Sequence, residues 1–261
     1  MLGVSVNAAS LVLPHIVDGG AWQSTIVLTN TSANAASGSL TFHQETTGGN
    51  TSAWNPPFLE TVSTSTLNFP GGSTLFLHTA DTAPTTTQGW GELVADPSVI
   101  GYVIFTNKGG GHESDGTAPA VAPTSRILVP YDDANGNKTG IAIANTSANE
   151  QSIMVAFRNN AGDAQGAAFT LPPFGHTSFI LSDQFTVIRG FLGLAEFYST
   201  SGTFSIIGLR INSTNSFTSA PAYFEGGAPL IVSTTDPGSG YMPPPYSPYG
   251  YVAPPAVGGA H

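Results

Sequence analysis

The residues best suited to chemistry in this sequence form an oxygen-rich run near the middle of the chain. These residues are Asp132, Asp133, Asn135 and Asn137. Three of them alternate along the chain, as ligands do in the first half of an EF-hand calcium loop. Lys138 stands where that loop has its turn glycine, and Ala144 stands where it has its bidentate glutamate. The run therefore predicts either weak calcium binding or a hairpin turn, which Asn-Gly favours.

A second candidate is the pair of carboxylates Glu92 and Glu196, which occupy matching positions in two similar halves of the chain. Glycosidases use two carboxylates at a set separation. Nothing in the sequence brings these two together, so a structural role in each half is the competing interpretation.

Other catalytic patterns are missing from the sequence. Its six histidines show no H-x-H or HExxH spacing, it contains no cysteine, and no G-x-S-x-G motif singles out a serine. We therefore predict a protein that is not an enzyme and that has no cofactor.

Three tryptophans, Trp22, Trp54 and Trp90, are candidates for stacking on sugar rings. Trp54 lies beside Asn55-Pro56-Pro57 in an expected loop and is predicted to be the exposed one. The other two lie in strand-like runs, so packing in a core or at its rim is the alternative to a glycan platform.

Composition narrows the classes of partner. Charged residues make up only 8% of the chain, and its six Lys and Arg residues are scattered while the net charge is -10. Nucleic-acid binding needs a basic stripe, so we exclude it. No run reaches the roughly 18 apolar residues that a membrane span needs.

The elements that must position these residues come from an internal duplication. Asn-Thr-Ser-Ala-Asn occurs at residues 30–34 and again at 145–149, each time after an apolar strand-like run. Asn and Ser favour turns, so the motif is expected to be a corner in each half. Five further blocks match in the same order, and one of these matched pairs contains Glu92 and Glu196.

Each half shows short alternating runs separated by turn signals, as in all-β sandwiches. We predict an all-β fold with two tandem β-sandwiches, immunoglobulin-like in the loose sense. The predicted divisions are a signal remnant or first strand at 1–10, sandwiches at 11–118 and 119–228, and a tail at 229–261. The connection between sandwiches is expected within the Gly/Pro/Ala-rich stretch 109–124.

The tail is rich in Pro, Tyr and Gly and has no core of its own, so we expect it to lie extended along a neighbouring surface. Tyrosines between prolines would anchor it, because each supplies a large ring at small entropic cost. The predicted assembly residues are Tyr241, Pro244, Tyr246, Tyr249 and Tyr251.

One resemblance bears on location. The run from Leu13 to Asn30 (LPHIVDGGAWQSTIVLTN), with Gly-His-Thr-Ser-Phe at 175–179 and Gly-Leu-Arg at 208–210, resembles a set of uncharacterised secreted bacterial proteins. It covers about residues 11 to 225 and leaves out the tail. The resemblance implies export and a strand-rich fold, without an assigned activity.

Two functions follow as expectations. The first is an extracellular structural protein that self-assembles as a homo-oligomer or polymer, such as a filament or surface-layer subunit, through sandwich edges and the tail. Few charges would have to be desolvated at its interfaces. The alternative is a secreted glycan-binding or adhesive module with a polysaccharide as its partner.

Overall fold

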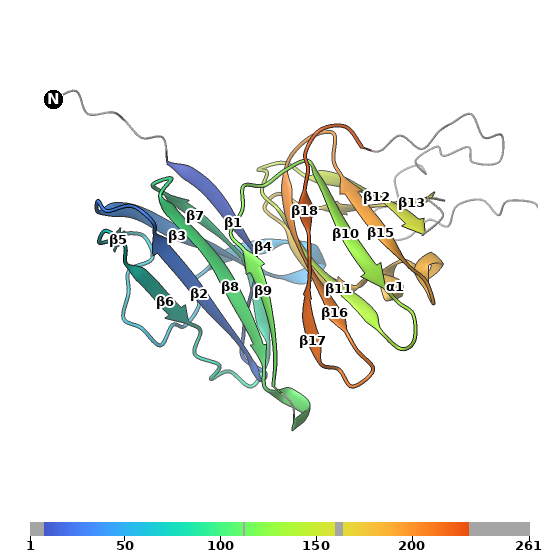
Figure 1. The fold of residues 1–261 in the computed structure, drawn as a ribbon, viewed down its shortest axis with the longest axis horizontal. Coiled ribbons are helices and arrows are strands. Elements are labelled where there is room, and N and C mark those ends of the chain that lie inside the picture. The colour runs from blue at the N-terminus through green and yellow to red at the C-terminus, as the bar shows by residue number, and fades with distance from the viewer. Residues whose placement is uncertain (1–7, 112, 160–163, 230–261) are drawn as a thin grey trace, which may run out of the picture.

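The computed structural model describes residues 8–111, 113–159 and 164–229, and it places them in two β-sandwiches that lie side by side (Figure 1). The elements of the first sandwich are β1 (Ala9–Asp18), β2 (Trp22–Asn30), β3 (Ala36–Glu45), η1 (Thr47–Gly49), β4 (Thr51–Trp54), β5 (Leu67–Phe69), β6 (Thr74–His78), β7 (Thr87–Ala95), β8 (Val99–Asn107), η2 (Gly109–Gly111) and β9 (Ser114–Pro119). The elements of the second are β10 (Arg126–Asp132), β11 (Lys138–Asn145), β12 (Gln151–Asn159), β13 (Ala164–Leu171), β14 (His176–Ile180), α1 (Leu181–Gln184), η3 (Thr186–Ile188), β15 (Leu192–Tyr198), β16 (Phe204–Ile211), β17 (Phe217–Ala220) and β18 (Tyr223–Phe224). The predicted all-β fold is confirmed.

Each sandwich consists of two antiparallel sheets packed over a core. In the first, one sheet has the order β1-β7-β3-β4, with β5 also pairing with β3, and the other has the order β6-β2-β8-β9. Leu13 and Leu93 from one sheet and Ile26 and Phe105 from the other are fully buried in one apolar cluster. Alternation along each strand sends these residues inward and leaves their neighbours on the outer side.

The second sandwich repeats this strand order. Its sheets are β13-β12-β15-β10-β18 and β14-β11-β16-β17. Strands β10, β11 and β12 correspond to β1, β2 and β3, and strands β14 to β17 correspond to β6 to β9. Strand β13 takes the place of β4 and β5, and β18 is an additional strand.

The repeated Asn-Thr-Ser-Ala-Asn motif forms the same corner twice, as expected. The side-chain amide of Asn30 donates to the backbone oxygens of Asn34, Phe69 and Pro70. Asn145 donates in the same way to the oxygens of Asn149, Leu171 and Pro172. Both asparagines are 0% exposed, so these contacts replace water for buried backbone groups at the strand ends.

A strand that the sequence analysis missed lies in the expected connection. β9 pairs with β8 along its whole length and completes the first sandwich. It alternates in burial, with Gly116 and Ala118 inward, but these residues are too small to show an apolar period in the sequence. Gly116 lies against the second sandwich, since a Cβ there would come within 2.8 Å of Leu209.

The two sandwiches meet through the outer sides of two sheets. Strand β11 is buried at seven of its eight positions. Ile141 and Ile143 belong to the core of the second sandwich. Ala142 instead joins the apolar cluster of the first sandwich, and Ala144 packs with Val12 and Trp90. The outer side of β1-β7-β3-β4 therefore packs against the outer side of β14-β11-β16-β17. In the described part of the chain, no helix is long and apolar enough to cross a membrane.

Candidate functional site

Polar side chains from both sandwiches meet at the interface between them. His176 on β14 donates its Nδ1–H to the Glu45 carboxylate on β3 at 2.7 Å, and its Nε2 lies 3.3 Å from Nδ1 of His15 on β1. Gln88 donates to the same Glu45 oxygen at 2.9 Å and lies within 2.9 Å of the Ser178 hydroxyl. We call these five residues the interface chain, because their contacts run without a break from β14 to β1.

Within the interface chain, burial governs the protonation of His15. Burial lowers the pKa of His15 well below its usual value, and the neighbouring His176 lowers it further. The two imidazoles are stacked with centroids 5.3 Å apart, so a second positive charge beside the first is strongly disfavoured. The interface chain therefore joins the two domains best when His15 is neutral.

An aromatic stack borders the interface chain. The His43 ring lies between Trp90 and Phe174, with centroid distances of 4.2 and 5.5 Å. The indole Nε1–H of Trp90 donates to the backbone oxygen of Phe174 in the other sandwich at 2.8 Å. Burial lowers the pKa of His43, and the charge of Glu92 partly offsets this effect.

None of the predicted sugar-stacking tryptophans is an exposed platform. Trp90 is 1% exposed at the domain interface, and Trp22 stacks on Phe217 of the other sandwich at 5.4 Å. The expectation that Trp54 is exposed is wrong: it is 8% exposed, because it ends β4 on the core side and packs edge-on against Phe42. Two of the three therefore hold the sandwiches together, and the third belongs to the core.

The predicted calcium candidates lie in the turn between β10 and β11. Asp132 accepts hydrogen bonds from Asn137 at 3.0 Å and from Arg210 at 2.8 Å. Asp133 instead accepts from the backbone N–H of Gly190, and Asn135 has a positive φ of 55° in the turn. Among the described residues, no group of three or more His, Cys, Asp or Glu side chains could hold a metal ion.

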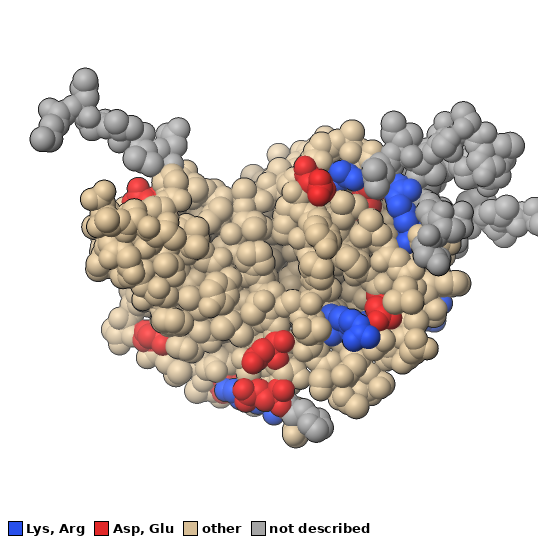
Figure 2. All heavy atoms as spheres, viewed as in Figure 1, with Lys and Arg blue, Asp and Glu red and all other residues tan. Residues whose placement is uncertain are grey.

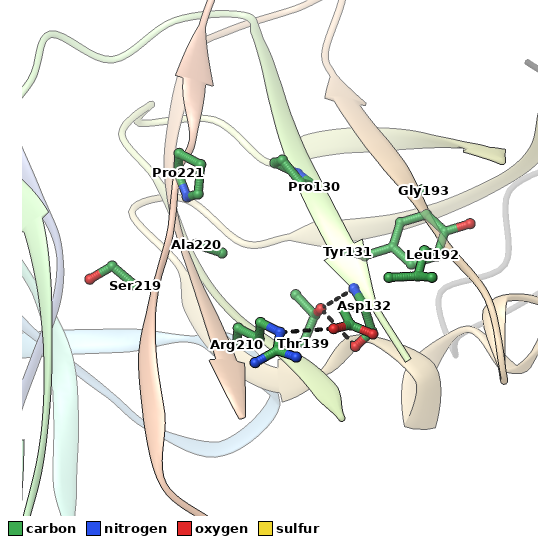
Figure 3. A pocket seen from close by; sticks show the side chains of 10 residues that line it. All are labelled: Pro130, Tyr131, Asp132, Thr139, Leu192, Gly193, Arg210, Ser219, Ala220 and Pro221. Atoms are coloured by element: carbon green, nitrogen blue, oxygen red, sulfur yellow. Dashed lines mark hydrogen bonds and ion pairs between the residues drawn. The ribbon is translucent and has the colours of Figure 1, made fainter. Parts of the chain in front are cut away.

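A recess of about 350 Å³ lies beside this turn, and Figure 3 shows the ten side chains that line it. Most of them are apolar or small, and its ion pair joins Asp132 to Arg210. The Thr139 hydroxyl accepts the backbone N–H of Asp132. Burial raises the pKa of Tyr131, which keeps that phenol neutral. The recess thus offers apolar contact beside a neutralised ion pair.

The two matched glutamates differ in burial and in their partners. Glu196 is 0% exposed and pairs with Arg126 at 2.6 Å and with Arg158 at 3.2 Å. Glu92 accepts a hydrogen bond from the Ser10 hydroxyl at 2.6 Å. They lie in separate sandwiches, as the duplication predicts, and each has partners of its own.

The outer side of the sheet formed by β6, β2 and β8 is largely apolar, and its ion pair joins His78 at the end of β6 to Glu60. These three strands contain no Asp, Glu, Lys or Arg. Phe76 is 49% exposed, Ile100 54% and Tyr102 40%. We call this surface the open face; its residues are Thr25, Val27, Thr29, Thr74, Phe76, His78, Ile100, Tyr102 and Ile104. The surface over β2, β6 and β8 in Figure 2 carries few charged side chains.

Phe76, Val27 and Tyr102 form one row across the three strands of the open face. Val27 is 3% exposed, because the two rings cover it from either side. Sequence reasoning missed this face, although the uncharged strands and the outward period of large residues were visible signals.

Comparison of the chain with protein-family models, with curated proteins and with solved structures finds no match. The resemblance to secreted bacterial proteins therefore stays a prediction. The predicted assembly tyrosines and Pro244 lie outside the described residues.

Proposed function

We propose that this protein is a structural subunit that self-associates outside the cell through the faces of its sandwiches. The open face carries the proposal. Soluble monomers rarely expose a large continuous apolar surface, and such a surface marks an interaction site. On the open face, large apolar side chains stand in register across three uncharged strands.

The chain itself supports the use of such a face for docking. The counterpart of the open face in the second sandwich is the outer side of β14-β11-β16-β17, which packs against the first sandwich. One of two duplicated surfaces is thus an interface already. The low charge of the chain reduces the cost of desolvating the other.

Sedimentation velocity and light scattering test the proposal. We expect the wild-type protein to form large particles, and Tyr102→Asp to abolish them, because a carboxylate in the centre of the open face would be buried unpaired. Val94→Asp is the matched control: Val94 is 38% exposed, similar to Tyr102, but lies on β7 of the other sheet. A wild-type protein that remains a monomer at high concentration contradicts the proposal.

The predicted role of the tail needs its own experiment. Deleting residues 233–261 should weaken or abolish the particles seen by electron microscopy if the tail straps neighbouring copies. Particles unchanged by the deletion would assign assembly to the sandwich faces alone.

A glycan-binding module is the second candidate, and one observation favours it. Phe76 and Tyr102 lie on either side of Val27 in the sheet, and aromatic rings at such positions can stack on sugar rings. This function predicts a monomer that is pulled down by an insoluble polysaccharide, with binding lost in Tyr102→Ala. Trp54→Ala should leave such binding unchanged, because Trp54 is buried.

A further inference from the structure

We infer that the open face of one copy docks onto the outer side of β13-β12-β15-β10-β18 of a second copy, in the arrangement that already joins the two sandwiches of one chain. This inference rests on the proposed self-association and specifies its geometry. We call the second surface the far face; its residues are Leu128, Met154, Leu192, Leu194, Tyr198 and Tyr223.

The duplication makes the two faces natural partners. Within the chain, the outer side of β1-β7-β3-β4 packs against the outer side of β14-β11-β16-β17. The far face is the counterpart of the first of these surfaces, and the open face is the counterpart of the second. Each molecule therefore contains one complete junction between its own two sandwiches. Its open face and its far face are the two halves that could form the same junction with neighbouring copies.

Side-chain sizes at matched positions are complementary. In the existing junction the large Trp90 packs with the small Ala144. Aligning Glu92 with Glu196 puts Leu194 in the place of Trp90, and aligning Asn30 with Asn145 puts Thr29 in the place of Ala144. Compared with the existing junction, the far face has the smaller residue, Leu194 in place of Trp90. The open face has the larger one, Thr29 in place of Ala144. The summed volume of the two side chains therefore changes little.

A second pair of matched positions is polar in the existing junction and apolar in the inferred one. In the existing junction the Ser178 hydroxyl contacts Gln88 at 2.9 Å. The same alignment puts Phe76 in the place of Ser178 and Leu192 in the place of Gln88. Phe76 is 49% exposed and Leu192 56%. Two large apolar side chains left in water by the single molecule would cover each other in the next junction.

The charges of the far face do not oppose this docking. Its Glu196 is 0% exposed, and the side chains of Arg126 and Arg158 that pair with it are only 11% and 14% exposed. Asp132, which lies opposite Leu192, already pairs with Arg210 at 2.8 Å, so docking at Leu192 covers a formed ion pair and not an unpaired charge. Because the two faces differ, the contact is heterologous and adds copies head to tail, which builds a filament, or a ring if the rotation closes.

Cross-linking tests this geometry cleanly, because the protein has no cysteine of its own. Phe76→Cys and Leu192→Cys variants are prepared separately and treated with a short bismaleimide, alone and mixed. We expect a covalent dimer in the mixture, monomer in each variant alone, and a ladder of multimers from the double variant. Val94→Cys mixed with Leu192→Cys is the matched control and should stay monomeric. Thr29→Cys with Leu194→Cys repeats the test at the other matched pair.

The outcomes separate the inference from the proposed function. Wild-type particles together with cross-links in both mixtures support head-to-tail docking. Wild-type particles with cross-linking of Phe76→Cys to itself, or with no cross-link in either mixture, overturn the inference and leave self-association standing. A monomeric wild-type protein overturns both.

Discussion

The stability of the domain interface should depend on pH through His15. In the unfolded chain His15 takes up a proton near pH 6.5, whereas burial and His176 hold its pKa well below that value in the folded protein. Below about pH 6.5 the unfolded state therefore binds more protons than the folded state, and the free energy of unfolding falls as the pH is lowered. Above that pH the contribution vanishes.

The size of the effect follows from the burial of this side chain. One group that stays neutral in the folded state and charged in the unfolded state lowers stability by up to about 1.4 kcal/mol per pH unit. His15 is only 8% exposed, so solvent does little to reduce the cost of placing a charge on its ring. Its neighbours in the interface chain are His176 and, beyond it, Glu45. The half-buried His43 adds a smaller slope of the same sign.

The perturbation is His15→Phe, which keeps a ring against His176 and Phe105 but cannot take up a proton. Urea unfolding followed by tryptophan fluorescence between pH 7.5 and pH 4.5 measures the slope. We expect the variant to lose most of the wild-type decline, at a cost of about 0.5–1.5 kcal/mol at neutral pH for the lost hydrogen bond. His78→Phe removes a partly exposed histidine of the same sandwich and is the control. An unchanged slope in His15→Phe would refute the assignment.

Three further predictions concern the residues that hold the two sandwiches in shape. Asn30→Ala and Asn145→Ala should each lower the free energy of unfolding by about 1–3 kcal/mol, because buried backbone oxygens lose their donor; equal costs in the two sandwiches are expected, and a neutral change at either would contradict the shared corner. Glu196→Ala should cost about 3–5 kcal/mol by leaving two buried arginines without this carboxylate, far more than Glu92→Ala, as thermal unfolding of both can check. Trp90→Phe should separate the unfolding of the two sandwiches into two calorimetric transitions, since the bridging indole N–H is lost; a single unshifted transition would argue against its bridging role.

The parts of the fold that could be predicted are those encoded locally. The motif at 30–34 and 145–149 marks a corner because Asn carries its own turn chemistry, and the structure uses it so in both sandwiches. β9 could not be predicted, because its inward residues Gly116 and Ala118 carry almost no apolar signal. Trp54 was misjudged for a related reason: the prolines after it indicated a loop, yet the strand before it directs the ring into the core.

The site could not be predicted, because it is made by contacts between distant segments. His15 and His176 are 161 residues apart and meet only through the packing of two sheets. One local signal was present: β11 is apolar at every position from Ile141 to Ala144, whereas a strand with one wet face alternates. Its counterpart in the first sandwich, β2, has threonine at residues 25 and 29, where β11 has Gly140 and Ala144. The difference between the copies was the clue to which face is covered.

The threonines of the open face reconcile an exposed apolar surface with solubility. Thr25 and Thr29 flank Val27 on β2 and replace the glycine and alanine of the closed counterpart. In a free molecule their hydroxyls bind water, while their branched Cβ atoms favour the strand. On docking, their methyl groups add apolar contact, and Thr29 already shares its hydroxyl with that of Thr74 at 3.0 Å, so burial leaves this pair hydrogen-bonded. Lysine or glutamate at these positions would keep the face equally hydrated but would oppose docking, so strands without Asp, Glu, Lys or Arg are what the proposed assembly requires of this surface.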